Sequence, residues 1–148
     1  MRDNRRIVLL LAVVAASGLA SAVKCGMQTA WEFDDAWKVY QEQKEQFWAS
    51  QGIDASDPRA QLYERRMQSR EATGFQALSN SQGAGLLLAG FAAFAVAGFS
   101  GRDLGTRALC VILGGLILSA IILTKSRGAL GAALAGFMLL AVAARWGG

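Results

Sequence analysis

The sequence contains no histidine, a single proline and only two cysteines among its 148 residues. Histidine is the commonest general base and the commonest metal ligand in proteins, so its absence excludes the usual form of either site. Cys25 and Cys110 lie 85 residues apart, which is not the spacing of a zinc site or of a CxxC redox motif. The residues therefore predict no metal site and point to no cofactor.

Charged residues are also scarce, at 18% of the chain against 53% hydrophobic residues. Uncharged stretches of 17 residues occupy positions 7–23, 108–124 and 128–144, and one of 30 residues occupies positions 72–101. A helix needs roughly 17–25 such residues to span a bilayer. We expect an all-α integral membrane protein with about four transmembrane helices. Its basic residues flank these stretches, so the net charge of +4 does not indicate a nucleic-acid surface.

The order of the stretches divides the chain into three parts. Residues 1–23 form a first transmembrane helix, residues 24–82 an extracytoplasmic helical loop, and residues 83–148 a three-helix transmembrane segment. The basic start, the apolar stretch and the small residues at 20–22 are also typical of a cleavable secretory signal. Both interpretations of the first stretch stay open on the residues alone.

The distribution of charge predicts an orientation. Four spans that start inside place residues 1–6, 100–107 and 145–148 in the cytoplasm, with six basic residues against two acidic ones. The stretch 24–82 then lies outside, with seven basic and nine acidic residues, in agreement with the positive-inside rule. The two cations of residues 125–127 would lie outside as well. This exception to the rule indicates a functional position.

Two helices are expected within residues 24–82. Aromatic residues recur at helical spacing in the first of them: Phe33, Trp37, Tyr40 and Phe47. That helix either lies at the membrane interface or packs on the rest of the loop.

The second of these helices should begin after a break at Gly52. Ser56, Asp57 and Pro58 are typical of a helix N-terminus. Its basic face is either a solvated surface or a stripe that faces an anion, and its members are Arg59, Tyr63, Arg66 and Arg70.

Small residues repeat every four positions in two of the apolar stretches, as in helices that pack closely in lipid. They are Gly85, Ala89, Ala93 and Ala97 in one stretch, and Gly128, Ala132 and Gly136 in the other. Four spans supply few partners for these stripes, so we expect the chain to be part of a larger multi-span fold.

The short connection at Lys125, Ser126 and Arg127 is the strongest candidate for chemistry. It holds two cations between apolar helices, and Arg127 begins the last helix, whose free N–H groups favour an anion. The guanidinium is a planar fork suited to phosphate oxygens, with Lys125 beside it as a point charge. The alternative is that both side chains only anchor the helices at the interface.

Two motifs resemble those of the bacterial O-antigen ligase and polymerase family. Residues 123–130, LTKSRGAL, are similar to its T-x-SRGA signature, with Ser126 and Gly128 as motif residues. Residues 69–80 are similar to the family's R-x-x-x-G-(T/F)-F…(P/S)-N element, which lies between an extracytoplasmic loop and the following helix. The matching positions there are Arg70, Gly74, Phe75 and Asn80.

The resemblance implies an inner-membrane glycosyltransferase that takes a glycan from undecaprenyl pyrophosphate on the periplasmic face. The acceptor would be lipid A–core, a growing polymer or a protein, and neither a nucleotide sugar nor a metal would be used. Arg127 matches the family's arginine in SRGA and is expected to act on the pyrophosphate as a catalytic residue. Lys125, Arg70 and Arg66 would bind the same group.

The chain departs from the family in two ways. Family members have ten or more spans, and a later periplasmic loop carries a histidine that this chain lacks. We therefore expect a partial chain that is catalytically incomplete by itself, with its N-terminus cytoplasmic and residues 1–23 retained as a helix. The alternative function is a small non-catalytic four-span module that binds other membrane proteins through its Gly/Ala stripes.

Overall fold

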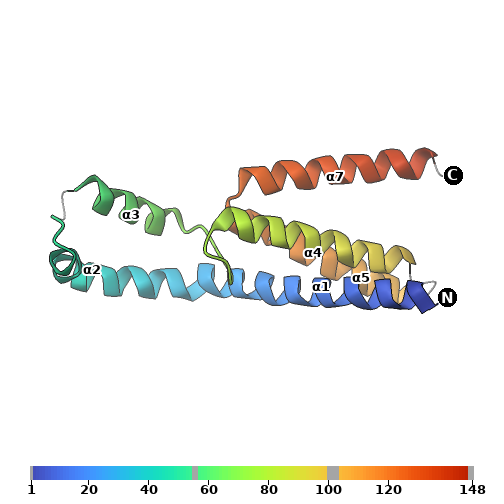
Figure 1. Ribbon diagram of the computed structural model, residues 1–148, viewed down its shortest axis with the longest axis horizontal. Coiled ribbons are helices and arrows are strands. Elements are labelled where there is room, and N and C mark those ends of the chain that lie inside the picture. Colours follow the sequence, from blue (N-terminus) through green and yellow to red (C-terminus); the bar gives the residue numbers. More distant parts are fainter. Residues whose placement is uncertain (1, 55–56, 100–103, 147–148) are drawn as a thin grey trace.

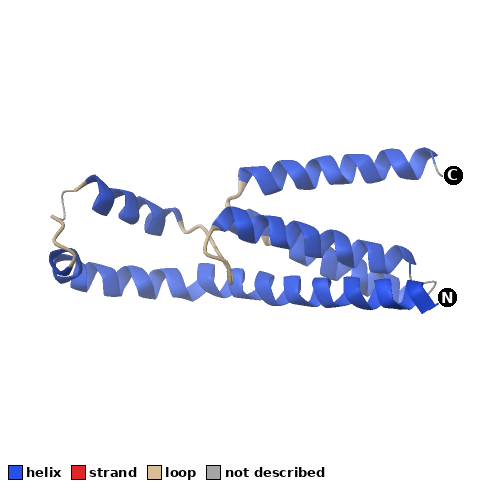
Figure 2. Cartoon of the chain, viewed as in Figure 1, coloured by secondary structure: helices blue, strands red, loops and turns tan. Residues whose placement is uncertain are grey.

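The computed structural model describes residues 2–54, 57–99 and 104–146, except for the side chains of residues 2, 3, 66, 99, 143 and 144. Every element in these residues is a helix (Figure 2). In chain order they are α1 (Arg2–Met27), the π-helix η1 (Gln28–Glu32), α2 (Phe33–Ser50), α3 (Pro58–Ser69), α4 (Ser79–Phe99), α5 (Leu104–Ser119), α6 (Ile121–Thr124) and α7 (Arg127–Trp146).

Three of the described helices are long and apolar enough to cross a membrane. They are Asn4–Ser50, Ser79–Gly98 and Leu104–Thr124, and Arg127–Val142 is a shorter apolar helix. The expectation of an all-helical chain with membrane-spanning helices agrees with this finding. The expected number of four spans stays a prediction, because three helices of the described residues qualify as candidate spans.

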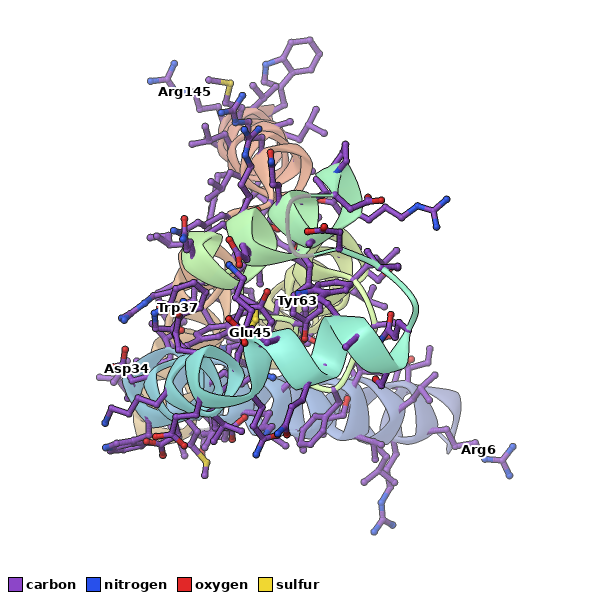
Figure 3. All side chains as sticks on the ribbon, turned by 90° about the vertical axis from the view of Figure 1, so that its left-hand side faces the viewer. Arg6, Asp34, Trp37, Glu45, Tyr63 and Arg145 are labelled. Atoms are coloured by element: carbon purple, nitrogen blue, oxygen red, sulfur yellow. The ribbon has the colours of Figure 1, made fainter. Side chains whose placement is uncertain are left out.

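The helices form a bundle with an arm (Figure 1). Helices α1, α4, α5 and α7 run alongside one another, and both ends of the chain lie at the same end of this bundle. Helices α2 and α3 project beyond the opposite end, and we call this pair the arm. Seen from the side of the arm, Arg6 and Arg145 lie at opposite edges of the molecule (Figure 3).

Close backbone approach joins α1, α4 and α5. A β-carbon added at Gly18 would lie 2.1 Å from the β-carbon of Ala89, and one at Gly90 would lie 2.5 Å from Leu118. Such contacts explain why small residues line α4, where Ala89, Ala93 and Ala97 are buried while Gly85 is exposed. The largest fully buried apolar side chains of this core are Leu86, Ile117 and Ile121.

Helix α7 packs along α4 through aromatic rings. The ring of Phe137 lies 5.5 Å from that of Phe91 and 5.9 Å from that of Phe94, measured between centroids. Gly136 fits against Phe91, but a β-carbon at Gly128 would meet no atom within 4 Å. The second small-residue stripe therefore does not act as one packing surface within this chain.

The first apolar helix and the aromatic helix after it are continuous. The helix passes through positions 23 and 24, where the sequence predicts the end of the first span, and the π-helix joins α1 to α2. This stretch holds no proline, and the helix continues through Gly26 without a break. As a result the first part of α2 extends along the direction of α1, and only its last turns run across that direction (Figures 1 and 3).

The arm has a small aromatic core of its own, which favours the second interpretation of the aromatic pattern. Tyr40, Trp48 and Ala60 are buried there, with Trp37, Ile53 and Met67 packed around them. The expected break and start are both present: α2 ends at Ser50 before Gly52, and the Asp57 side chain caps α3 by accepting from Arg59 N. Pro58 occupies the first turn, as predicted.

Candidate functional site

The turn between α6 and α7 directs two polar side chains inward and two cations outward. Lys125 adopts a left-handed conformation with φ 52°, and its N–H bonds to Ile122 O. The hydroxyl of Thr124 accepts from Ser126 N at 3.3 Å, and the Ser126 hydroxyl caps α7 by accepting from Ala129 N at 3.2 Å. Thr124 and Ser126 are buried, so Lys125 and Arg127 are left exposed.

The two motif segments meet at this turn although they lie about 50 residues apart in the sequence. Ala72 N donates to Leu123 O at 3.0 Å. The ammonium of Lys125 donates to Ser69 O at 2.5 Å. These bonds hold Ser69 against Lys125. The SRGA-like turn therefore lies beside the end of α3.

Arg70 does not continue the basic face of α3, and the prediction of one shared stripe is wrong. It is the C-cap of the helix, with φ 49°, and its guanidinium pairs with the Asp34 carboxylate on α2. Tyr63 lies within α3 as predicted, and its ring contacts those of Tyr40, Phe47 and Trp48 within the arm. Arg59 is exposed, and the Arg66 side chain lies outside the described residues.

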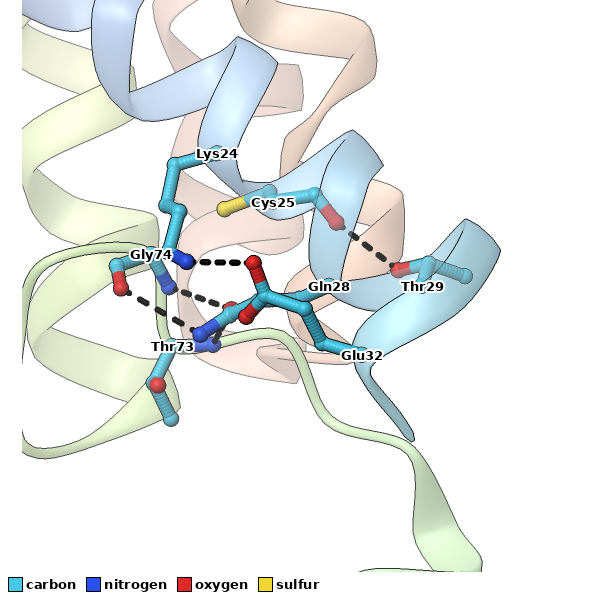
Figure 4. A network of polar contacts seen from close by, with 7 residues as sticks. All are labelled: Lys24, Cys25, Gln28, Thr29, Glu32, Thr73 and Gly74. Atoms are coloured by element: carbon cyan, nitrogen blue, oxygen red, sulfur yellow. Dashed lines mark hydrogen bonds and ion pairs between the residues drawn. The ribbon is translucent and has the colours of Figure 1, made fainter. Parts of the chain in front are cut away.

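A glutamine from the π-helix clamps the loop that follows Arg70 (Figure 4). Gln28 accepts from Thr73 N at 3.1 Å and from Gly74 N at 2.9 Å, and it donates to Gly74 O at 3.3 Å. Gly74 is buried with φ 58°, and a β-carbon there would lie 2.5 Å from the Gln82 side chain. The predicted motif residue Gly74 is therefore required by the shape of the loop.

The other two residues of this motif lie at the surface. Phe75 has 68% of its area exposed, and Asn80 is exposed in the first turn of α4. The loop is fixed on this side by Ser79, whose hydroxyl donates to the Glu71 carboxylate at 3.0 Å. Neither Phe75 nor Asn80 touches the cations in any described contact.

The available positive charge at the junction belongs to Arg127 and Lys125. Arg127 is exposed and has no ion pair or side-chain hydrogen bond among the described residues. Lys125 uses one of its three donors on Ser69 O, and Arg70 is shared with Asp34. This arrangement of exposed cations at a helix N-terminus can bind a phosphate-bearing anion.

The arm beside the junction is held by a coupled set of polar groups. Tyr40 accepts from Trp48 Nε1 at 2.8 Å and donates to Glu64 at 3.0 Å, and Lys44 pairs with the same carboxylate at 2.5 Å. The Lys44 ammonium, followed by the Tyr40 hydroxyl, lowers the pKa of Glu64. Burial raises the pKa of Tyr40, and the bond to Glu64 raises that of Lys44.

Sequence reasoning missed the residues that fix the junction from α1, η1 and α2. Lys24 pairs with Glu32 at 2.5 Å, Gln28 holds the loop, and Asp34 pairs with Arg70. Their positions depend on the π-helix, for which the sequence carries no local signal.

Comparisons with protein-family models, curated proteins and solved structures gave no match. The chemistry of the site thus has to be argued from the junction itself. Its groups are cations, hydroxyls and backbone amides, with the Asp34 carboxylate paired to Arg70, and the chain holds no histidine. The cations and N–H groups of such a set can bind and polarise an anionic leaving group.

Proposed function

We propose that the chain forms part of the pyrophosphate site of a membrane glycosyltransferase. The donor would be a glycan on undecaprenyl pyrophosphate, and the acceptor lipid A–core, a polymer or a protein. One observation carries the proposal: the two motif segments meet, so that Lys125, Arg127 and Arg70 gather at one end of the apolar bundle. Arg127 has the catalytic role, because its charge opposes the charge that develops on the leaving pyrophosphate.

The position of the site agrees with the chemistry of a lipid-linked donor. The polyprenyl chain requires an apolar environment, and the cations lie where the apolar helices end and the polar arm begins. In this proposal the arm and the junction face the periplasm, and the two chain ends face the cytoplasm of a bacterial inner membrane. Arg6, Arg107 and Arg145 then lie on the cytoplasmic side, as the positive-inside rule requires.

Substitution of Arg127 tests the proposal in membranes of cells that carry the protein. We expect Arg127→Ala to abolish glycan transfer and to cause the lipid-linked donor to accumulate, with an unchanged amount of protein in the membrane. A charge-assisted hydrogen bond contributes about 1.5–3 kcal/mol, so a loss of roughly tenfold to a hundredfold is the minimum expected. Arg127→Lys should restore little activity, because a point charge replaces a bidentate fork.

The matched control is Arg145→Ala, which removes an exposed arginine from the other end of the same helix. It should leave transfer unchanged. Normal transfer by the Arg127→Ala protein would exclude the proposed role of Arg127 and leave the motif turn as a structural element.

The second candidate is a non-catalytic assembly module, and α7 provides the observation that favours it. One face of α7 carries Gly128 and Gly131, where an added β-carbon would meet no atom within 4 Å. In this account a partner helix packs there, so Gly128→Leu should disrupt a complex detected by cross-linking, whereas Arg127→Ala should not. The opposite pattern, with transfer lost and the complex intact, supports the glycosyltransferase.

A further inference from the structure

A groove in the arm lies directly beside the proposed anion site. It has a volume of about 290 Å³ and is lined by Phe33, Trp37, Met67, Gln68 and Arg70. Arg70 belongs both to this groove and to the junction, where Lys125 holds the adjacent Ser69. The groove thus adjoins the cations of the junction at Arg70. Its volume is close to the lower limit of small-molecule sites, about 300 Å³.

The polar groups of the groove are available to a ligand. Neither the indole N–H of Trp37 nor the Gln68 carboxamide has a hydrogen-bond partner in the described part of the chain. By contrast, the indole N–H of Trp48 donates to the Tyr40 hydroxyl at 2.8 Å. A partly buried indole N–H ordinarily finds a partner, so the Trp37 N–H is available to bond water or a ligand in the groove.

These groups correspond to the chemistry of a sugar phosphate. An indole face is electron-rich and attracts the C–H face of a pyranose ring, while the amide and the indole N–H can bond its hydroxyls. Arg70 has five donors, and its pair with Asp34 joins a single nitrogen to the carboxylate. The remaining donors can reach a phosphate at the edge of the groove.

We propose that this groove binds the sugar attached to the pyrophosphate of the donor, with Trp37 and Gln68 as specificity-determining residues. The inference rests on the proposed function, because the phosphate of that sugar would occupy the Arg70, Lys125 and Arg127 junction. It assigns the arm a direct role in the choice of the donor glycan.

Binding of sugar 1-phosphates to the full chain in lipid nanodiscs, measured by calorimetry, tests the proposal. The probes are the 1-phosphates of glucose, galactose and N-acetylglucosamine, with inorganic phosphate and glycerol 1-phosphate as references. We expect at least one sugar phosphate to bind tenfold more tightly than inorganic phosphate. Glycerol 1-phosphate, the headgroup fragment of a phospholipid, should show no such gain.

Three variants separate the sugar site from a purely structural effect. Trp37→Leu keeps an apolar side chain in the arm, and Gln68→Ala changes an exposed residue. Each should lower the affinity for the sugar phosphate fivefold or more and leave the affinity for inorganic phosphate unchanged. Trp31→Leu is the matched control, because Trp31 is 65% exposed and does not line the groove.

The outcomes distinguish this inference from the proposed function. If inorganic phosphate binds but no sugar phosphate binds more tightly, the sugar site is wrong and the anion site stands. If Trp37→Leu and Gln68→Ala lower the affinity for inorganic phosphate as much as the affinity for the sugar phosphate, both residues are structural and the inference is overturned. If neither class of probe binds, the anion site and the sugar site both fail.

Discussion

At the residue scale, the junction depends on two buried hydroxyls that determine where two cations lie. Thr124 and Ser126 face inward and bond the backbone of the turn, and the left-handed Lys125 lies between them. The alternation of small polar and basic residues leaves Arg127 at the surface at the start of α7. A solvated anchor would need no such turn, since a long cationic side chain can reach water from most positions near a helix end.

Gly74 provides a test of how tightly the loop is held. Gly74→Ala should lower the stability of the chain by about 2–5 kcal/mol. A left-handed conformation costs a β-carbon about 1–2 kcal/mol, and overpacking against Gln82 adds about 1–3 kcal/mol. The measurement is the thermal unfolding midpoint of the full chain in nanodiscs.

Gly52→Ala is the matched control, because Gly52 has φ 67° but an added β-carbon there would meet no atom within 4 Å. It should show only the smaller, conformational part of the effect. Gln82→Ala combined with Gly74→Ala should recover part of the loss by removing the clash. Equal effects at Gly52 and Gly74 would contradict the tight packing of the loop.

Residues whose role is local were predictable from the sequence. Asp57 before Pro58 specifies a helix start, and Gly52 specifies an end, through bonds and angles within a few neighbours. Gln28 and Asp34 act on residues that lie 46 and 36 positions away, so no neighbouring residue indicates their partners. Arg70 was singled out by its motif, but its left-handed cap removed it from the expected helix face.

At the scale of elements, α2 and α3 are joined by the ionised Glu64 carboxylate. Because the folded arm lowers the pKa of Glu64, its contribution to stability is present above the ordinary glutamate pKa of about 4.3. That contribution is lost as the pH falls through the lower, folded-state value. We expect the arm to loosen in acid below about pH 4, which tryptophan fluorescence would detect through exposure of Trp48.

Glu64→Gln separates this carboxylate from general acid effects. At neutral pH the arm of this variant should be less stable than that of the unaltered chain. Its fluorescence should also change less as the pH is lowered, because the titrating group is gone. Lys44→Met should weaken the arm at neutral pH in the same direction, since it removes the first cause of the lowered pKa. A wild-type transition that the Glu64→Gln variant reproduces in full would show that other groups control the arm.

The continuity of α1 and α2 shows what element-level patterns leave undetermined. The aromatic spacing from Phe33 onward correctly predicts a helix with a packed face. Hydropathy marks only where the apolar stretch ends, and a helix can continue past that point when no breaker stops it. The direction of α2 relative to the bundle therefore could not be predicted from composition.

At the scale of the whole molecule, a charged arm with its own aromatic core projects beyond one end of an apolar helix bundle. The junction of the two motif segments lies between them, where Lys125, in the turn before α7, donates to Ser69 O at the end of the arm. In our proposal the lipid tail, the pyrophosphate and the first sugar of the donor occupy the bundle, the junction and the arm in that order.

The most direct test of this account is the affinity of inorganic pyrophosphate for the full chain in nanodiscs, measured by calorimetry with the Arg127→Ala and Arg145→Ala variants. The account predicts saturable binding that weakens at least tenfold in Arg127→Ala, remains unchanged in Arg145→Ala and decreases with added salt. Equal affinities for all three proteins, or no binding by the unaltered chain, would contradict the pyrophosphate site.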